Sequence, residues 1–388
     1  MTTHDRPEGR ARRIALVTSR YWPSFGGIQS HVQALAEHLV GAGHEVTVLT
    51  HDLDGDDPEH DVLNGVRVRR FLPLVPSEHL LLAPALGAHL ASSRSSYDLV
   101  HAHGYHDTPA ALVMRSWEGP YVFTPHFHGS SASRLRSALH VPYRRVGRRI
   151  VHHARRVVCV TPSEREAFLR WFPTAVDKTD VISNGVDVDR LRAAAPRDPE
   201  PCGRRLLVTA GRLEAYKRVD RVVDAMAHLG DRFVLEVCGD GPERAALEQR
   251  AARAGLGHAV RFRGRVSDAD LASTISSAAA LVSMSEHEAQ GIVLLEAAAA
   301  GTRSVASHIP AHADVAATTG ATHLVPADAE PHHLAGTIAD AAGRPRATAA
   351  VASWPDVAAR TARLYEDVLR THPAGSAPRV GGGARPPA

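Results

Sequence analysis

The chain has 388 residues, of which 44% are hydrophobic, and this length is enough for two domains with full cores. Such a composition excludes a chain that is mainly disordered. The formal net charge is only +3, so we expect no nucleic-acid partner.

An alternation of strands and helices fills the first half of the chain. A buried-strand run at 13–19 leads to Gly26 and Gly27, and a helical repeat follows at 28–40. Later apolar runs predict strands at 46–49, 97–102, 121–124, 157–161 and 181–182. Because strands that alternate with helices form parallel sheets, we expect a Rossmann-like N-terminal domain at 13–186, after a disordered segment at 1–12.

A second series of strands and helices fills the other half. The proline-rich stretch 187–204 is expected to be a linker. Apolar runs then predict strands at 206–210, 233–238, 260–264, 280–284, 304–306 and 322–325. We expect a second Rossmann-like domain at 205–352, facing the first across a cleft. An amphipathic helix is expected at 353–372 and a disordered tail at 373–388.

Cysteines, histidines and apolar runs bear on compartment and metal binding. Three cysteines without CxxC spacing are expected to be reduced. No run approaches 18 apolar residues and residues 1–13 are polar, so we expect a cytoplasmic protein that is neither exported nor membrane-spanning. The histidine pairs at 152–153 and 332–333 lack partners at zinc-ligand spacing, and we expect no metal site.

Two carboxylates, Glu288 and Glu296, lie around a loop that becomes an alanine-rich helix at Gly291. The free N–H groups of a helix start, here around Gly291 and Ile292, favour an anion. Two carboxylates in this arrangement can contact both ends of one elongated ligand, so the pattern indicates a ligand with hydroxyls and phosphates. The alternative is that the two glutamates only cap the helix.

Two basic residues follow the strand at 206–210, which breaks at Gly211. Arg212 and Lys217 lie where a parallel strand leads into a helix, and α/β sheets bind ligands at that edge. An arginine supplies a planar fork and a lysine a point charge, and both suit a diphosphate.

Together these residues resemble the retaining glycosyltransferases of family GT4, which have the GT-B fold. Further matches are Gly26-Gly27, His103, His126, Asn184-Gly185-Val186-Asp187 and Gly239-Asp240-Gly241-Pro242. One departure is that three residues rather than four separate Leu213 from Lys217. The resemblance covers nearly the whole chain, and it implies that the C-terminal helix crosses back onto the N-terminal domain.

The resemblance implies transfer of a hexosyl group from a nucleoside diphosphate sugar to a hydroxyl, with retention of configuration. Arg212 and Lys217 would hold the diphosphate without a metal ion. Glu288 would anchor the donor sugar and Glu296 the ribose. His126 would face the sugar and acceptor, unless it only packs a loop or the neighbouring His128 takes that place.

Several residues, and both substrates, have more than one interpretation. Gly26 and Gly27 would let the first loop approach the donor, or they form an ordinary turn. His103 is either a core histidine or an acceptor contact, and Asp240 either a turn residue or a ligand contact. The residues beside Glu288 differ from the family pattern, so GDP-mannose and UDP-hexoses both remain candidate donors. A lipid-linked sugar, a polysaccharide end or a small metabolite would suit as acceptor.

Other functions and partners also remain possible. The alternatives are a sugar-nucleotide epimerase or hydrolase, and a noncatalytic protein that binds a membrane or partner. No acidic residue lies between Glu118 and Glu164, whereas eight arginines fall in the segment Arg134–Arg156. One interpretation is that this segment binds an anion, which would be a lipid headgroup on the inner face of the plasma membrane or a phosphorylated acceptor. The other interpretation is a solvated helix face.

Overall fold

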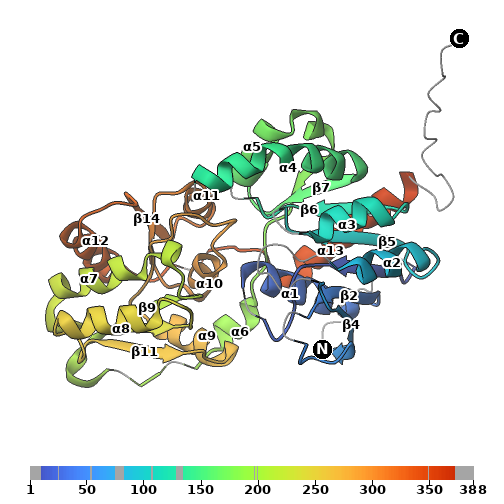
Figure 1. Cartoon of the computed structure of the whole chain (residues 1–388). Coiled ribbons are helices and arrows are strands. Elements are labelled where there is room, and N and C mark those ends of the chain that lie inside the picture. The colour runs from blue at the N-terminus through green and yellow to red at the C-terminus, as the bar shows by residue number, and fades with distance from the viewer. Residues whose placement is uncertain are drawn as a thin grey trace, which may run out of the picture.

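Two α/β domains make up the computed structural model, and they lie side by side in Figure 1. The structure describes residues 10–24, 26–52, 55–74, 83–105, 108–127, 134–195, 197–198, 200–347 and 349–371, without the side chains of 134–142 and 201. The predicted disordered tail 373–388 lies outside the described residues, as do residues 1–9 of the predicted disordered segment 1–12. Among the described helices, none combines the length and apolar character needed to span a membrane.

The first domain is built on an eight-stranded sheet in the order β3-β4-β2-β1-β5-β6-β7-β8. Its strands are β1 (Arg13–Val17), β2 (Glu45–His51), β3 (His60–Leu63), β4 (Val66–Phe71), β5 (Leu99–His103), β6 (Tyr121–Thr124), β7 (Arg156–Cys159) and β8 (Thr179–Val181). Its helices are α1 (Gly27–Gly41), α2 (Pro84–Ser92), α3 (Pro109–Ser116), α4 (Arg134–His153) and α5 (Pro162–Trp171).

All neighbours in this sheet are parallel except β3 and β4. Ile14 of β1 lies between Val46 of β2 and Leu99 of β5, and all three side chains are buried. Helices cover both faces, which is why these central strands are apolar without alternation. Strands β3 and β4 were not predicted. The half-exposed sequence of β3 and the three arginines within β4 both lack the pattern of a buried strand.

The second domain has a six-stranded, wholly parallel sheet in the order β11-β10-β9-β12-β13-β14. Its strands are β9 (Arg205–Ala210), β10 (Phe233–Cys238), β11 (Val260–Gly264), β12 (Ala280–Ser283), β13 (Ser304–Ser307) and β14 (Thr322–Val325). Its main helices are α7 (Val219–Leu229), α8 (Arg244–Arg253), α9 (Asp268–Ser277), α10 (Ile292–Ala300), α11 (Pro310–Thr319) and α12 (Pro331–Gly343).

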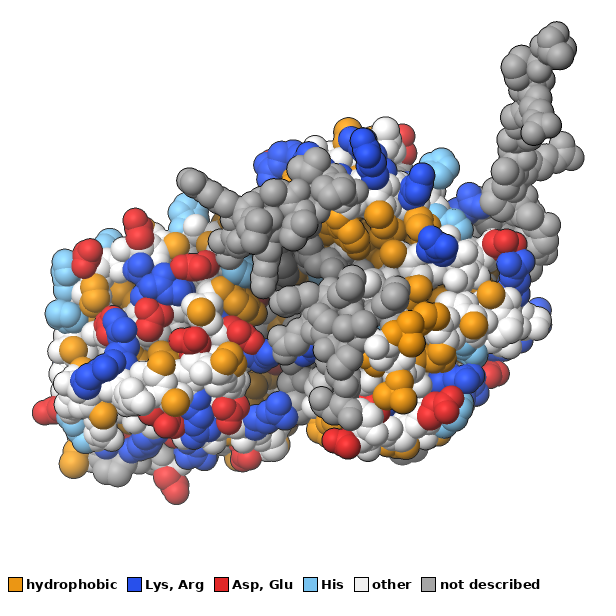
Figure 2. Space-filling model, in the orientation of Figure 1, with side chains coloured by type: hydrophobic (Ala, Val, Ile, Leu, Met, Phe, Trp, Pro, Cys, Tyr) orange, Lys and Arg blue, Asp and Glu red, His pale blue; other side chains and the backbone are white. Residues whose placement is uncertain are grey.

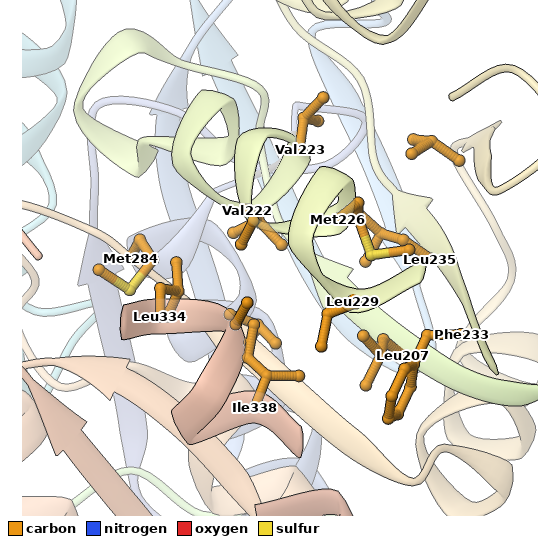
Figure 3. Close-up of a cluster of buried hydrophobic side chains, with 14 of the residues drawn as sticks. Leu207, Val222, Val223, Met226, Leu229, Phe233, Leu235, Met284, Leu334 and Ile338 are labelled. Carbon is orange, nitrogen blue, oxygen red and sulfur yellow. The ribbon is translucent and has the colours of Figure 1, made fainter. Parts of the chain in front are cut away.

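One face of this sheet carries a dense apolar core, shown in Figure 3. Val222 and Met226 of α7 pack with Leu207 of β9, Phe233 of β10 and Ile338 of α12. Burying each of these side chains stabilises the fold by about 1.5–3 kcal/mol, and this core fixes β9 and α7 on either side of the loop that holds Arg212.

The segment between the domains is more structured than a plain linker. Within 187–204, α6 (Val188–Ala193) begins at Asp187, whose side chain accepts a hydrogen bond from the N–H of Arg190. Leu191 is buried in a core cluster of the second domain. Part of the predicted linker therefore packs on the C-terminal domain.

The last described helix, α13 (Trp354–Thr371), returns to the first domain and packs on α1 (Figure 1). Trp354 and Tyr365 are buried in the same cluster as the β1 and β2 side chains. A side chain at Gly185 would collide with the backbone of Trp354, which explains a glycine at the crossing point. The predicted fold, with two Rossmann-like domains and a crossing helix, is confirmed.

Candidate active site

A pocket opens at the carboxyl ends of β9 and β12, the two neighbouring central strands of the second sheet. The residues that line it come from β9 and the loop after it, the start of α7 and the end of β12: Thr209, Ala210, Gly211, Arg212, Leu213, Lys217, Val219, Ser283 and Ser285. Parallel α/β sheets bind ligands at this edge. The structure thus brings the predicted Arg212 and Lys217 to one pocket.

The loop after β9, which lines the pocket, packs closely against the loop after β10. A Cβ on Gly239 would collide with the carbonyl oxygen of Gly211, and one on Gly241 would press on the backbone of Leu213. The N–H of Leu213 donates to the carbonyl of Asp240 at 3.0 Å. The Asp240 carboxylate accepts from the N–H of Gly241 at 2.8 Å, which is a turn contact and supports the turn interpretation.

Lys217 and Glu288 form an ion pair beside the pocket. The lysine Nζ lies 2.5 Å from Glu288 Oε1, and the Ser285 hydroxyl donates to the same oxygen at 2.9 Å. Their side chains are only 21% and 16% exposed. Burial acts to lower the pKa of Lys217, but Glu288 more than offsets it and the net pKa is raised. Burial likewise acts to raise the pKa of Glu288, but Lys217 lowers it on balance, so both groups stay charged.

Arg212 lies at the rim of the pocket with 44% of its side chain exposed. Its guanidinium contacts Glu214 Oε1 at 2.6 Å. An exposed pair of this kind is worth about 0–1 kcal/mol, so an anionic ligand can displace Glu214 at little cost. The guanidinium is therefore available to a ligand in the pocket.

Helix α10 begins beside Glu288. Gly291, its N-cap, has a φ of +83°, a conformation that side chains rarely adopt, and a Cβ there would press on the ring of His312. Ile292 is half-buried and packs on a core cluster of this domain. The first amides of α10 are therefore held next to the Lys217–Glu288 pair, although Glu288 itself belongs to the loop.

Glu296 lies on the second turn of α10 and is partly buried. Burial raises the pKa of its carboxyl to about 7, and Asp268 adds to the shift. In the described part of the chain this carboxyl has no hydrogen-bond or ion-pair partner. Glu296 therefore caps no described end of the helix, and the alternative in which both glutamates only cap α10 does not hold for it.

On the first domain, Gly26 caps α1 and Gly27 is its first residue. The φ of Gly26 is 165°, which is extended backbone open to any residue. A Cβ on Gly27 would meet nothing within 4 Å. The fold itself does not require glycine at Gly27, so a requirement for it would have to come from a ligand.

His126 follows β6 and is buried, with a φ of +47°. The next residue, Phe127, donates its N–H to Glu164 Oε1 at 2.5 Å, and Val160 donates to Glu164 Oε2 at 2.5 Å. Burial raises the pKa of Glu164 to about 7 against the effect of these donors. Glu164 thus fixes the turn that carries His126, a role that sequence did not indicate. His128 lies outside the described residues.

A line of buried polar groups connects the two domains. The side-chain oxygen of Gln290, in the loop with Glu288, accepts from the N–H of Asn184 at 2.9 Å. Asn184 Oδ1 lies 2.5 Å from Nδ1 of His31, whose ring is 5.0 Å from that of His126. The predicted His126 is thereby linked to the loop of Glu288 through residues that sequence analysis missed. Only the Asn184 motif hinted at them.

Residues 25–190 match the model of Glycosyltransferase Family 4, and residues 194–348 match that of Glycosyl transferases group 1. The chain belongs to glycosyltransferase family 4. A phosphatidyl-myo-inositol mannosyltransferase from Mycolicibacterium smegmatis is 32% identical to it over 378 residues, 92% of this chain and 94% of the relative. The family assignment drawn from the motifs is confirmed.

Solved structures support the same fold for this family 4 member. Sucrose-phosphate synthase from Thermosynechococcus elongatus superposes with a TM-score of 0.71 at 21% identity, covering 93% of this chain and 100% of that one. HepE from Anabaena, in complex with UDP-glucose, gives a TM-score of 0.70 at 19% identity, covering 93% and 99%. At these identities the likeness shows the GT-B fold alone.

Proposed function

We propose that this family 4 glycosyltransferase moves a hexosyl group from a nucleoside diphosphate sugar to a hydroxyl acceptor, with retention of anomeric configuration. The observation that carries the proposal is the charged Lys217–Glu288 pair beside a pocket whose rim bears Arg212. The mannosyltransferase relative favours a mannosyl donor such as GDP-mannose, whereas the UDP-glucose bound to HepE favours a UDP-hexose.

The chemistry requires stabilisation of the negative charge on the departing diphosphate. Arg212, Lys217 and the first amides of α10 supply fixed positive charge and donors at one edge of the sheet, so this step is proposed to need no metal ion. Glu288 anchors the donor sugar and Glu296 the ribose. The acceptor attacks from the face on which the diphosphate leaves, so neither glutamate acts as a nucleophile, and His126 faces the sugar and acceptor.

We further propose that α4 brings the enzyme to an anionic membrane surface where a lipid-linked acceptor is found. Arg145, Arg148 and Arg149 are exposed on α4 and pair with no described carboxylate. In Figure 2 basic side chains gather over the part of the first domain that holds α4 and α5, whereas both signs of charge alternate on the second domain.

The test is nucleotide release from a panel that includes GDP-mannose and several UDP-hexoses, with a chelator present, and with or without an anionic lipid extract. Arg212→Ala serves as the loss-of-function variant. We expect release from one donor that rises with the extract and is lost in the variant, because Arg212 would contact the diphosphate directly.

Other outcomes discriminate the alternatives. Release that does not depend on any acceptor, with the hexose set free or converted, would favour a hydrolase or epimerase. Binding of no donor in the panel would contradict the transferase proposal and favour a noncatalytic protein that binds a membrane or partner.

A further inference from the structure

A buried histidine of α11, His312, lies against the start of α10. Its side chain is fully buried. A Cβ on Gly291, the N-cap of α10, would lie 3.1 Å from Cδ2 and 3.3 Å from Nε2 of His312. The Nε2 side of the ring therefore faces the helix start that lies beside the Lys217–Glu288 pair.

The other ring nitrogen of His312 is fixed by Ser307. Nδ1 lies 2.9 Å from the carbonyl oxygen of Ser307 and 3.1 Å from its hydroxyl oxygen. A carbonyl oxygen only accepts, and the hydroxyl donates its single proton to the carbonyl of Ser285, so Nδ1 must carry a proton. Burial lowers the pKa of His312 although Glu288 acts to raise it, and the ring is neutral at pH 7. Nε2 therefore keeps a lone pair that can accept a hydrogen bond.

This lone pair has no partner in the described part of the chain. Nε2 of His312 is buried and makes no hydrogen bond to any described residue. By contrast, the buried His101 of the first domain uses both ring nitrogens, with Tyr365 at 2.7 Å and Thr124 at 2.8 Å. An unpaired buried acceptor destabilises a fold, so packing alone does not explain a histidine at this position of α11.

His312 is also connected to the pocket. Ser285 lines the pocket, and its carbonyl accepts from the Ser307 hydroxyl, which contacts Nδ1 of His312. The charges of Glu288 and Lys217 shift the pKa of His312 in opposite directions, and His312 in turn helps to lower the pKa of Glu288. His312 therefore belongs to the same site as the ion pair. Sequence analysis missed it because it lies on a different helix from the Glu288 motif and is one of 25 histidines.

We propose that Nε2 of His312 accepts a hydrogen bond from one hydroxyl of the transferred hexose. This inference rests on the proposed function and adds to it a residue that selects among donor sugars. A neutral lone pair accepts from a sugar hydroxyl but not from a diphosphate oxygen, which itself only accepts. Because Nε2 is enclosed, the hydroxyl reaches it when the turn at Gly291 shifts around the sugar.

The experiment measures binding to the full chain by isothermal titration calorimetry. The ligands are the nucleoside diphosphate sugar selected by the release assay, analogues that each lack one hexose hydroxyl, and the free nucleoside diphosphate. For the native chain, loss of at least one hydroxyl should weaken binding by about tenfold, as expected for one hydrogen bond to a buried acceptor.

Two variants of His312 separate its ring nitrogens. His312→Asn keeps a donor near Ser307 but loses the acceptor at Nε2. It should bind the intact donor about tenfold more weakly, bind the critical analogue no worse than the intact donor, and bind the nucleoside diphosphate as the native chain does. In His312→Gln an amide oxygen can replace Nε2, so this variant should keep the preference for the intact donor.

A purely structural role for His312 would weaken binding of the nucleoside diphosphate and of every analogue alike, and this result would overturn the inference. An equal loss for each missing hydroxyl in the native chain and in His312→Asn would also overturn it. The native chain alone supplies a test that needs no variant to fold, because binding that depends on no hexose hydroxyl contradicts the inference. If the native chain binds no donor, the proposed function fails as well; if it binds a donor without dependence on His312, only this inference fails.

Discussion

The ion pair between Lys217 and Glu288 is better explained by ligand binding than by a contribution to the stability of the fold. Placing an ion pair in a poorly solvated position costs desolvation energy that the mutual attraction often fails to recover, so such a pair adds little stability. This one lies beside a pocket and is partly exposed. Its charges are therefore fixed in advance for a polar ligand.

Lys217→Ala should lower the rate of donor turnover by on the order of 10²–10³, because a fixed positive charge beside the departing diphosphate is lost. Steady-state nucleotide release measures the effect. Arg253→Ala, at an exposed position on α8, is the matched control and should leave the rate unchanged. A decrease below about tenfold for Lys217→Ala would contradict its role at the diphosphate.

The ionisation of Glu296 should make the stability of the fold depend on pH. Its pKa is about 7 in the fold and about 4.5 as an ordinary glutamate, so ionisation favours the unfolded chain. Its contribution to stability is complete below pH 4.5 and is lost as the pH rises towards 7. Glu296→Gln removes this titration.

We therefore expect Glu296→Gln to melt at the same temperature as the native chain near pH 4.5 and at a higher temperature at pH 8. Calorimetry over this pH range measures the difference. The same variant should bind the donor more weakly, because a ribose contact is lost. A melting difference that does not change with pH would show that Glu296 is not perturbed.

Helix α4 combines an apolar face with a basic face that no described carboxylate neutralises. Tyr143 and Val146 pack on the core of the first domain, while Arg145, Arg148 and Arg149 are exposed. The guanidinium carbon of Arg144 lies 3.9 Å from the centre of the ring of Trp171 on α5, and this contact holds Arg144 against α5. The exposed arginines are thus free to meet an anionic surface.

Changing Arg145, Arg148 and Arg149 to glutamate should weaken binding to phosphatidylserine vesicles by at least about 100-fold, since each basic residue near such a surface contributes about 1 kcal/mol and the new carboxylates are repelled. Vesicle sedimentation at low salt measures it. A control with Arg192→Glu and Arg253→Glu should bind as the native chain does. Equal binding by the native chain and the α4 variant would show that the basic face is only solvated and does not bind the membrane.

Hydrogen bonds join the two domains around the site. Ser163 donates its N–H to Asp314 at 2.8 Å, and Thr161 donates to the carbonyl of Ala289 at 3.3 Å. Gln290 accepts from Asn184 at 2.9 Å, and both residues are buried. These polar contacts join the first domain to α11 and to the loop of Glu288, so we expect them to break if the domains open for substrate entry.

Gln290→Ala leaves the buried N–H of Asn184 without its acceptor, a loss of about 1–3 kcal/mol that falls on the closed arrangement alone. We expect a larger radius of gyration in small-angle scattering and slower donor turnover. The exposed Gln249→Ala on α8 is the control and should match the native chain. Unchanged scattering and turnover would show that this contact does not hold the domains closed.

The fold and much of the pocket could be predicted from local patterns in the chain. Apolar strands that alternate with helices favour parallel sheets, and residues that follow such strands converge at one edge. Arg212 and Lys217 follow β9, and Glu288 follows β12, its neighbour, so their meeting was predictable. The family pattern supplied their proposed roles, which stay predictions.

The contacts between distant segments could not be predicted from such patterns. The packing of α6 on the second domain, the support of His126 by Glu164, and the link from Gln290 to His31 depend on which helix faces meet. The position of His312 against Gly291 has the same origin. Periodicity determines which side of an element is buried, because that depends on neighbours along the chain. Periodicity does not determine which distant segment the buried face contacts, since this contact depends on how whole elements pack.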